Sequence, residues 1–165
     1  MVRIVSAAIA ALLLTGAAEP PASPALPAPL PAPVPATPAL SAPLTLTLVL
    51  TGLRSSDGEL RLCLWQQADA FPDCKKGQDV RLLSAPAAPE VRIAVPDLAP
   101  GRYAVSVIHD ENDNRKLDKN FMGIPTEGVG FSHNPAMTFG PPSFAKASFD
   151  VAAEPVQTIR MKYFL

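Results

Sequence analysis

Oxygen-bearing side chains recur at regular spacing between residues 110 and 118. Asp110, Asn112, Asn114 and Asp118 occupy the first, third, fifth and ninth positions of an EF-hand-like calcium loop. Ca²⁺ takes about six to eight oxygen ligands, and a tightly wound loop presents alternate side chains and one carbonyl, here that of Lys116, to a single point. The spacing therefore predicts a calcium site in this loop.

Two positions depart from that pattern. Arg115 stands where glycine usually permits the sharp turn, and Phe121 stands where a bidentate glutamate is expected. Glu127, Glu111 or Asp113 could supply a missing ligand. The alternative is a solvated acidic turn whose asparagines adopt left-handed backbone, and the sequence leaves both interpretations open.

Two histidines flank the same segment. His109 and His133, with Asp110 and Glu127, could form an acid/base site or a transition-metal site with mixed ligands. The simpler interpretation has His109 ending a strand with local hydrogen bonds and His133 lying in a turn. Because no nucleophile elbow, phosphate loop or zinc motif occurs, we expect no catalytic residues. An enzyme using His109, Asp110 and Glu127 remains the alternative.

The elements that must position these residues are predicted to be strands. Alternating apolar residues predict strands at 44–51, 59–65, 80–83, 91–95, 102–109, 146–151 and 156–164. The first two flank a turn at 55–58 and are typical of a hairpin. About seven short strands with Pro- and Gly-marked turns predict an all-β, antiparallel β-sandwich, with a small closed barrel as the alternative.

Residues 110–144 do not follow this strand pattern. They are rich in Gly, Asn, Asp and Pro, and a long irregular loop inside a compact domain is usually functional or held by other contacts. Phe131, Phe139 and Phe144 are expected to anchor it to the sandwich. The alternative is an exposed aromatic surface for a sugar or a peptide.

The chain has two cysteines, and their spacing matches neither a C-x-x-C redox motif nor a zinc site. In an exported chain this predicts a disulfide between Cys63 and Cys74. Trp65 shares the strand face of Cys63, so it either packs on the disulfide or lies on an open face.

Export is predicted from the N-terminus. Residues 1–18 combine Arg3, an apolar run at 4–14 and small residues at 15–18, which is the pattern of a cleavable signal peptide. Residues 19–43 contain ten prolines and are expected to form an extended spacer. We therefore expect a folded domain at 44–165 in the periplasm or outside the cell, without a transmembrane segment after cleavage.

Four sequence segments resemble the bacterial domain-of-unknown-function family 2141. They are DLAPGRY at 97–103, HDENDNRKLD at 109–118, GIPTEGVGFS at 123–132 and FGPPSF at 139–144. The resemblance implies an exported sandwich of transthyretin-like or immunoglobulin-like kind, and it implies no activity. Members of the family often have glycine at the position of Arg115.

These observations predict a binding or structural module of the cell envelope, with Ca²⁺ ordering the 110–118 loop. An unknown envelope protein or glycan is the expected partner. Nucleic acid is not expected, because the formal charge is −1 and no basic stripe occurs. A scaffold without any ligand is a further alternative.

Overall fold

The computed structural model describes residues 42–74, 80–138 and 140–165, which all belong to one compact unit. The predicted signal peptide at 1–18 and all but the last two residues of the predicted spacer lie outside the described residues, as does Phe139. Within the described ranges, no helix is long and apolar enough to cross a membrane.

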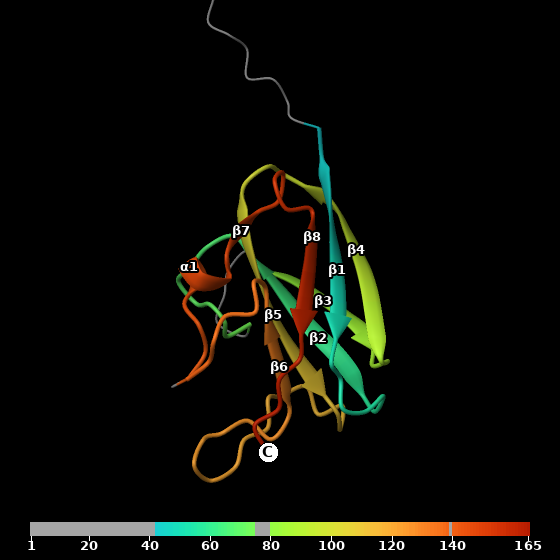
Figure 1. The fold of residues 1–165 in the computed structure, drawn as a ribbon, viewed down its shortest axis with the longest axis vertical. Coiled ribbons are helices and arrows are strands. Elements are labelled where there is room, and N and C mark those ends of the chain that lie inside the picture. The colour runs from blue at the N-terminus through green and yellow to red at the C-terminus, as the bar shows by residue number, and fades with distance from the viewer. Residues whose placement is uncertain (1–41, 75–79, 139) are drawn as a thin grey trace, which may run out of the picture. The chain divides into compact units, whose positions relative to one another are not determined.

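Over the described residues of the domain, the chain forms eight strands and one short helix (Figure 1). Their bounds are β1 Leu44–Thr51, β2 Glu59–Trp65, β3 Arg81–Pro86, β4 Glu90–Leu98, β5 Arg102–Asp110, β6 Gly128–Phe131, α1 Phe144–Ala147, β7 Phe149–Asp150 and β8 Val156–Arg160. One sheet has the order β4-β1-β8, and the other has the order β3-β2-β5-β6, with β7 paired to β5. The prediction of an all-β sandwich is confirmed.

The predicted hairpin of the first two strands is wrong. β1 pairs with β4 and β8, whereas β2 pairs with β3 and β5, so the turn after β1 carries the chain from one sheet to the other. The β1–β8 pair is parallel, and all other strand pairs are antiparallel. Both strands bury one leucine face, and a core between two sheets takes one such face from each.

The main core lies between the sheets. It consists of the inward side chains of β1, β2, β4, β5 and β8 with those of the β7 region; its fully buried members include Leu46, Leu48, Leu50, Leu60, Val95, Val105, Val151 and Ile159. Alternate residues of each strand supply it, as the period of two requires. Burying such side chains contributes roughly 1.5–3 kcal/mol each relative to exposure.

A second apolar cluster covers the outer face of the five-stranded sheet. Trp65 is buried there beside Cys63, and Phe71 packs edge-on against its ring, with centroids 5.7 Å apart. Phe71 also contacts Phe131 and Phe144 at centroid distances of 6.0 and 5.8 Å. Two of the three predicted anchors therefore hold the long loop to the sheet.

The 110–144 segment contains a strand that the sequence pattern hides. In β6, Val129 belongs to the outer cluster, while Gly128 and Gly130 face the C-terminal segment. A Cβ at Gly128 would lie 2.6 Å from the Tyr163 ring, and one at Gly130 would lie 2.9 Å from Met161 Sδ. Glycine leaves room for this close approach, and its low strand propensity conceals the strand.

The predicted strand at 146–151 is also largely wrong. α1 occupies 144–147, and only residues 149–150 pair with β5. The first turn of this segment is helical because the backbone N–H groups of Lys146 and Ala147 donate to Ser143 O and that of Ser148 donates to Phe144 O.

The predicted disulfide is confirmed, and its removal is expected to destabilise the domain. Cys63 on β2 is bonded to Cys74, eleven residues later, which ties the 66–74 segment to the sheet. Replacing both cysteines by serine should lower the free energy of unfolding by roughly 2–4 kcal/mol, because the unfolded chain gains entropy. Urea unfolding with and without a thiol reductant measures this. Reductant should shift the wild-type midpoint and leave the variant unchanged; equal midpoints for the two proteins without reductant would contradict the prediction.

Candidate functional site

The 110–118 loop is organised around a buried carboxylate. Asp110 ends β5 with no exposed surface, and its two oxygens accept hydrogen bonds from the backbone N–H groups of Asn114 (3.0 Å) and Arg115 (2.7 Å). Arg115 adopts φ +62° and Asp113 adopts φ +55°. The backbone at Arg115 therefore takes the left-handed turn that glycine usually provides at this position, at some conformational cost.

The other predicted side-chain ligands converge on Asp118. Oδ2 of Asp118 accepts hydrogen bonds from the side-chain amides of Asn112 at 2.8 Å and Asn114 at 2.7 Å. The amide oxygens of the two asparagines accept the backbone N–H groups of Asn114 and Lys116, respectively. The loop is thus wound by consecutive side-chain-to-backbone turns.

Glu127 closes the loop from the far side. Its carboxylate is buried and accepts the backbone N–H groups of Glu111 (3.2 Å) and Asp118 (3.0 Å). Burial raises the pKa of Glu127, and the negative charges of Asp110 and Asp118 raise the pKa further. The carboxyl groups of Asp110, Asp118 and Glu127 therefore interact electrostatically. Backbone N–H groups donate to those of Asp110 and Glu127.

The structure brings Asp110, Asn112, Asn114 and Asp118 together, whereas the side chain of Lys116 lines a groove on the sheet face described below. Within the described residues, no group of three or more His, Cys, Asp or Glu side chains is arranged to hold a metal ion. The side-chain oxygens of Asp110, Asn112 and Asn114 accept backbone N–H groups. Calcium binding stays a prediction.

In the alternative enzyme site, His109 has hydrogen-bond partners other than Asp110 and Glu127. His109 is fully buried; its Nε2 donates to Asp57 O at 2.8 Å, and its Nδ1 lies 2.7 Å from the Tyr163 hydroxyl. As neighbours on β5, His109 and Asp110 point to opposite faces of the strand. Both ring nitrogens of His109 therefore have partners that hold the fold together, and neither partner is Asp110 or Glu127.

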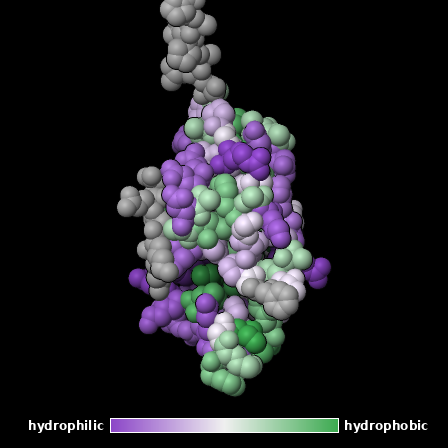
Figure 2. All heavy atoms as spheres, turned by 90° about the vertical axis from the view of Figure 1, so that its left-hand side faces the viewer, coloured by the Kyte–Doolittle hydropathy of each residue, from purple (hydrophilic) through white to green (hydrophobic). Residues whose placement is uncertain are grey.

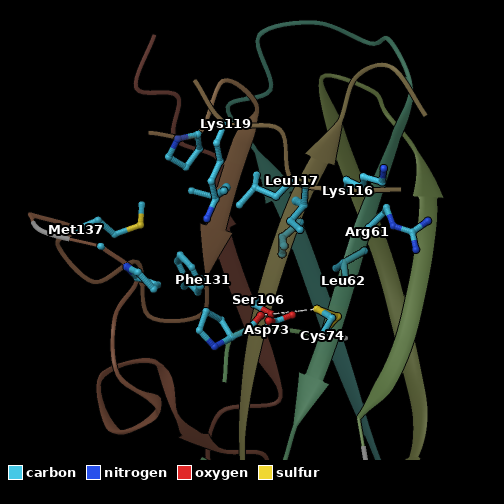
Figure 3. Close-up of a pocket in the computed structure, with 18 of the residues that line it drawn as sticks. Arg61, Leu62, Asp73, Cys74, Ser106, Lys116, Leu117, Lys119, Phe131 and Met137 are labelled. Atoms are coloured by element: carbon cyan, nitrogen blue, oxygen red, sulfur yellow. Dashed lines mark hydrogen bonds between the residues drawn. A yellow bond between two sulfur atoms is a disulfide. The ribbon is translucent and has the colours of Figure 1, made fainter. Parts of the chain in front are cut away.

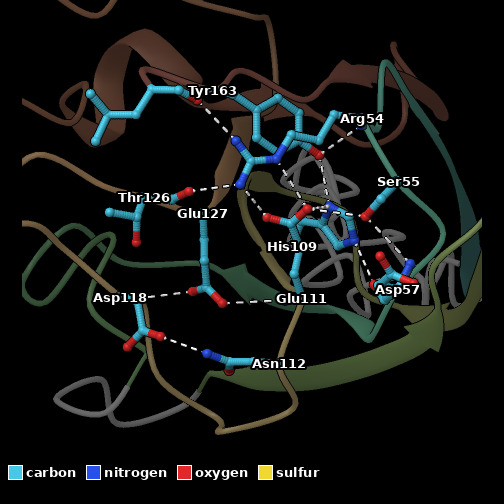
Figure 4. A network of polar contacts seen from close by, with 11 residues as sticks. Arg54, Ser55, Asp57, His109, Glu111, Asn112, Asp118, Thr126, Glu127 and Tyr163 are labelled. Atoms are coloured by element: carbon cyan, nitrogen blue, oxygen red, sulfur yellow. Dashed lines mark hydrogen bonds and ion pairs between the residues drawn. The ribbon is translucent and has the colours of Figure 1, made fainter.

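Arg54 connects this loop to the C-terminus. Its guanidinium donates to both carboxylate oxygens of Glu111 (3.0 and 2.6 Å), to Thr126 O and to Leu165 O. Its Cζ also lies 4.6 Å from the centroid of the Tyr163 ring (Figure 4). The hydrogen bonds from Arg54 lower the pKa of Glu111. A bidentate pair of this kind fixes geometry as well as charge.

A groove lies on the outer face of the five-stranded sheet, and strand register builds its floor. Cys63 on β2 pairs with Leu82 on β3 and with Ser106 on β5, which in turn pairs with Phe131 on β6. A second row runs from Arg61 through Ile108 to Val129. Directly paired residues point to the same face, so the two rows form one continuous surface.

The walls of the groove come from irregular segments. Residues 115–117, 119 and 123–125 form one wall, residues 72–74, 137, 138, 140 and 141 contribute to the others, and Phe164 adds a residue near the C-terminus (Figure 3). Leu117, Ile124 and Met137 make the walls apolar, and the enclosed volume is about 1040 Å³. This volume lies at the upper end of the range of small-molecule sites, roughly 300–1,000 Å³.

The rim of the groove is mainly cationic. Among the described residues, Arg61, Arg115, Lys116 and Lys119 line it, against one carboxylate, that of Asp73. Arg61 pairs with Glu59 at 2.7 Å, whereas the three loop cations are exposed and have no recorded ion pair within the described residues. The groove thus offers an apolar floor with positive charge along one side.

Sequence reasoning missed three of these features. Arg54 gave no signal, because its partners lie more than fifty positions away. The groove requires the register of four strands, which a single sequence does not specify. Phe121 was considered only as a failed calcium ligand, yet its side chain is 97% exposed.

The comparisons with known proteins identify a family and no activity. A family described as "Uncharacterized protein conserved in bacteria" (DUF2141) matches residues 48–160. No curated protein and no solved structure matches the chain.

The Arg54–Glu111 pair generates a prediction on pH. Because the folded-state pKa of Glu111 is lowered, its contribution is present above the unfolded pKa of about 4.3 and is lost as the pH falls through the folded-state value. Glu111→Gln should therefore cost about 1 kcal/mol of stability at pH 7, and the difference from wild type should disappear in acid. Chemical unfolding from pH 2.5 to 7 measures it.

Glu90→Gln is the matched control. Glu90 forms an ion pair with Arg92 in which both side chains are at least half exposed, so its removal should change stability little at any pH. A Glu111→Gln cost that does not depend on pH would contradict the prediction.

Proposed function

The chain belongs to the bacterial family 2141, whose description assigns no activity, and we propose from its geometry that it is an exported binding module of the cell envelope. Its groove on the five-stranded sheet would take an amphipathic anion, namely an acyl chain with one anionic head group. The observation that carries the proposal is the combination of an apolar floor with unpaired cations on the rim.

The apolar part of the groove supports a hydrocarbon ligand. Ile108 is half-buried on the floor, and Val129 and Phe131 are buried beside it, so a chain laid there would remove further apolar surface from water. Each buried methylene contributes roughly 0.8 kcal/mol. The floor is built on paired strands and held by the Cys63–Cys74 disulfide, which limits the ordering cost of binding.

The charged part supports an anionic head group. Arg115, Lys116 and Lys119 lie on the same wall of the groove, and binding an anion there needs no existing ion pair to break. Close to a low-dielectric apolar wall, such charges act more strongly than in bulk water. A cationic or neutral ligand of the same chain length lacks this contribution.

Export is part of the proposal and rests on two supports. The signal-like pattern at residues 1–18 predicts passage across a membrane, and a disulfide is typical of oxidising compartments. We therefore place the protein in the periplasm or outside the cell. An envelope protein or a glycan stays a predicted partner; stacking of a sugar in the groove has little support, because Phe131 is buried.

Binding of decanoate tests the groove. We expect resonances of the floor and of residues 115–119 to shift in NMR titrations with decanoate, and to shift much less with decyltrimethylammonium. Ile108→Glu should weaken decanoate binding at least about tenfold, because it puts a negative charge on the floor. Lys116→Gln should weaken it about fivefold, which corresponds to about 1 kcal/mol.

Val156→Glu is the matched control for the charge change. Val156 lies on β8, is 56% exposed and does not line the groove, so decanoate binding should be unchanged. Equal affinity for the anionic and the cationic probe, or full affinity in the Ile108→Glu variant, would contradict the proposed function.

Calcium binding by the 110–118 loop is a second, separate proposal. It is supported by the convergence of Asn112 and Asn114 on Asp118 and by the left-handed backbone of Arg115, which gives the winding that a calcium loop needs. The side-chain amides of both asparagines would have to turn their oxygens toward the ion. Ca²⁺ would also offset the mutual repulsion of the negative charges of Asp110, Asp118 and Glu127.

Thermal unfolding of chelator-treated protein measures this effect. A site occupied at a hundred times its dissociation constant stabilises by about 2.7 kcal/mol, so a few millimolar Ca²⁺ should raise the unfolding midpoint by several degrees. Asp118→Asn should reduce the shift, and Mg²⁺ should not reproduce it, because it requires stricter geometry. No shift at millimolar Ca²⁺ would overturn the calcium proposal and leave the groove proposal standing.

A further inference from the structure

The tip of the 110–127 segment exposes two large apolar side chains. Phe121 is 97% exposed and Met122 is 63% exposed. Single exposed apolar residues are common on protein surfaces. Two adjacent ones at the end of a projecting turn are less easily explained by packing, because they contribute nothing to either apolar cluster.

The turn that carries them is rigid. Oδ1 of Asn120 accepts the backbone N–H groups of Met122 and Ile124, both at 3.0 Å, and Gly123 N donates to Asn120 O at 3.0 Å. The base is closed by a bridge between Lys119 and Pro125. The two side chains are therefore presented by an ordered backbone, which lowers the entropy cost of inserting them into a partner.

The tip lies at one end of the domain. In Figure 1 the loop and the C-terminus are at the end opposite the start of β1, and Figure 2 shows hydrophobic side chains gathered at that end. Phe164 and Leu165 are 42% and 62% exposed. The Phe121–Met122 tip and these two C-terminal residues are therefore apolar and exposed at the same end of the domain.

The charges around the tip indicate what it contacts. Of the acidic residues in the segment, Asp110 and Glu127 are buried, Glu111 pairs with Arg54, and Asp118 accepts two amides. The remaining exposed charges are one acid, Asp113, and three cations, which are Arg115, Lys116 and Lys119. An apolar tip with a net positive surround is complementary to an anionic bilayer, into which apolar side chains insert below the charged head groups.

We propose that the Phe121–Met122 tip docks on anionic phospholipid surfaces, with Lys119 and its neighbouring cations lying at the head groups. This site is distinct from the groove floor and does not depend on the proposed groove ligand. Two inserted side chains and three cations give weak, reversible attachment, because each cation near an anionic surface strengthens binding only about fivefold.

A tryptophan placed at the tip reports on insertion directly. The chain contains a single tryptophan, the buried Trp65, so the wild-type chain supplies the background. In full-length Phe121→Trp, vesicles containing phosphatidylglycerol should shift the emission to the blue, and brominated lipid should quench it; phosphatidylcholine vesicles should do neither. Any membrane affinity of residues 1–18 cannot produce this signal, because it arises at position 121.

Two further variants separate the apolar from the electrostatic part. Adding Lys119→Gln to the tryptophan variant should raise the lipid concentration at half-maximal shift about fivefold, and added salt should act in the same direction. Adding Val156→Ser, which removes an apolar side chain that is 56% exposed on β8 and does not line the groove, should have no effect. Ile108→Glu separates this proposal from the groove, since it should weaken decanoate binding at least about tenfold and leave the tryptophan shift intact.

Three results would overturn the proposal. They are the absence of a blue shift with anionic vesicles, an equal shift with neutral vesicles, and a shift that depends on protein concentration without lipid. The last would indicate that the tip contacts a second copy of the chain. Circular dichroism of each variant establishes that the domain is folded in these measurements.

Discussion

The five-stranded sheet is apolar on both faces, and most of the structure follows from the need to cover both. Alternate residues of β2 and β5 send Leu62 and Val107 into the main core and Cys63 and Trp65 to the outside. A sandwich of two sheets covers only the inner face. The outer face is covered by loops, which need the disulfide and the aromatic contacts of Phe71 to stay in place.

That cover is incomplete, and the groove is the part of the outer face that the loops leave open. Its floor continues the buried surface around Trp65, and its walls are the loop segments themselves. The need to cover the apolar outer face of the sheet therefore accounts both for the stabilising loops and for the groove between them. The disulfide belongs to both, because Cys63 lies on the floor and Cys74 in a wall.

The sequence predicted what depends on local periodicity and missed what depends on contacts distant along the chain. The alternation in 44–51 and 59–65 predicts the bounds of β1 and β2 to the residue, since the leucines of each strand recur every second position and face the main core. The same pattern does not state which sheet a strand joins, so the predicted hairpin was wrong. β6 was missed because Gly128 and Gly130 are selected by the approach of Tyr163 and Met161, not by strand propensity.

In the candidate site, too, local features could be predicted from the sequence and features that depend on distant contacts could not. The oxygen spacing at 110–118 predicted a loop wound on itself, and the hydrogen bonds of Asp110, Asn112 and Asn114 have that form. The cationic wall could not be recognised from composition, because the segment carries more acids than bases. Burial of Asp110 and Glu127 and the pairing of Glu111 withdraw three negative charges from the surface.

The arrangement of charge in this segment links its inside to its outside. The buried carboxylates of Asp110 and Glu127 accept backbone N–H groups inside the loop, while Arg115, Lys116 and Lys119 are exposed. A backbone that winds around an acidic centre places alternate side chains on the opposite side, so an anion-attracting surface follows from an acid-filled interior. A cation bound inside the loop would strengthen the same outward field, because it would cancel the negative charge that lies nearest to the three exposed cations. Occupancy of the loop and attraction of anions would then be coupled through charge alone, without any change in the fold of the sheet.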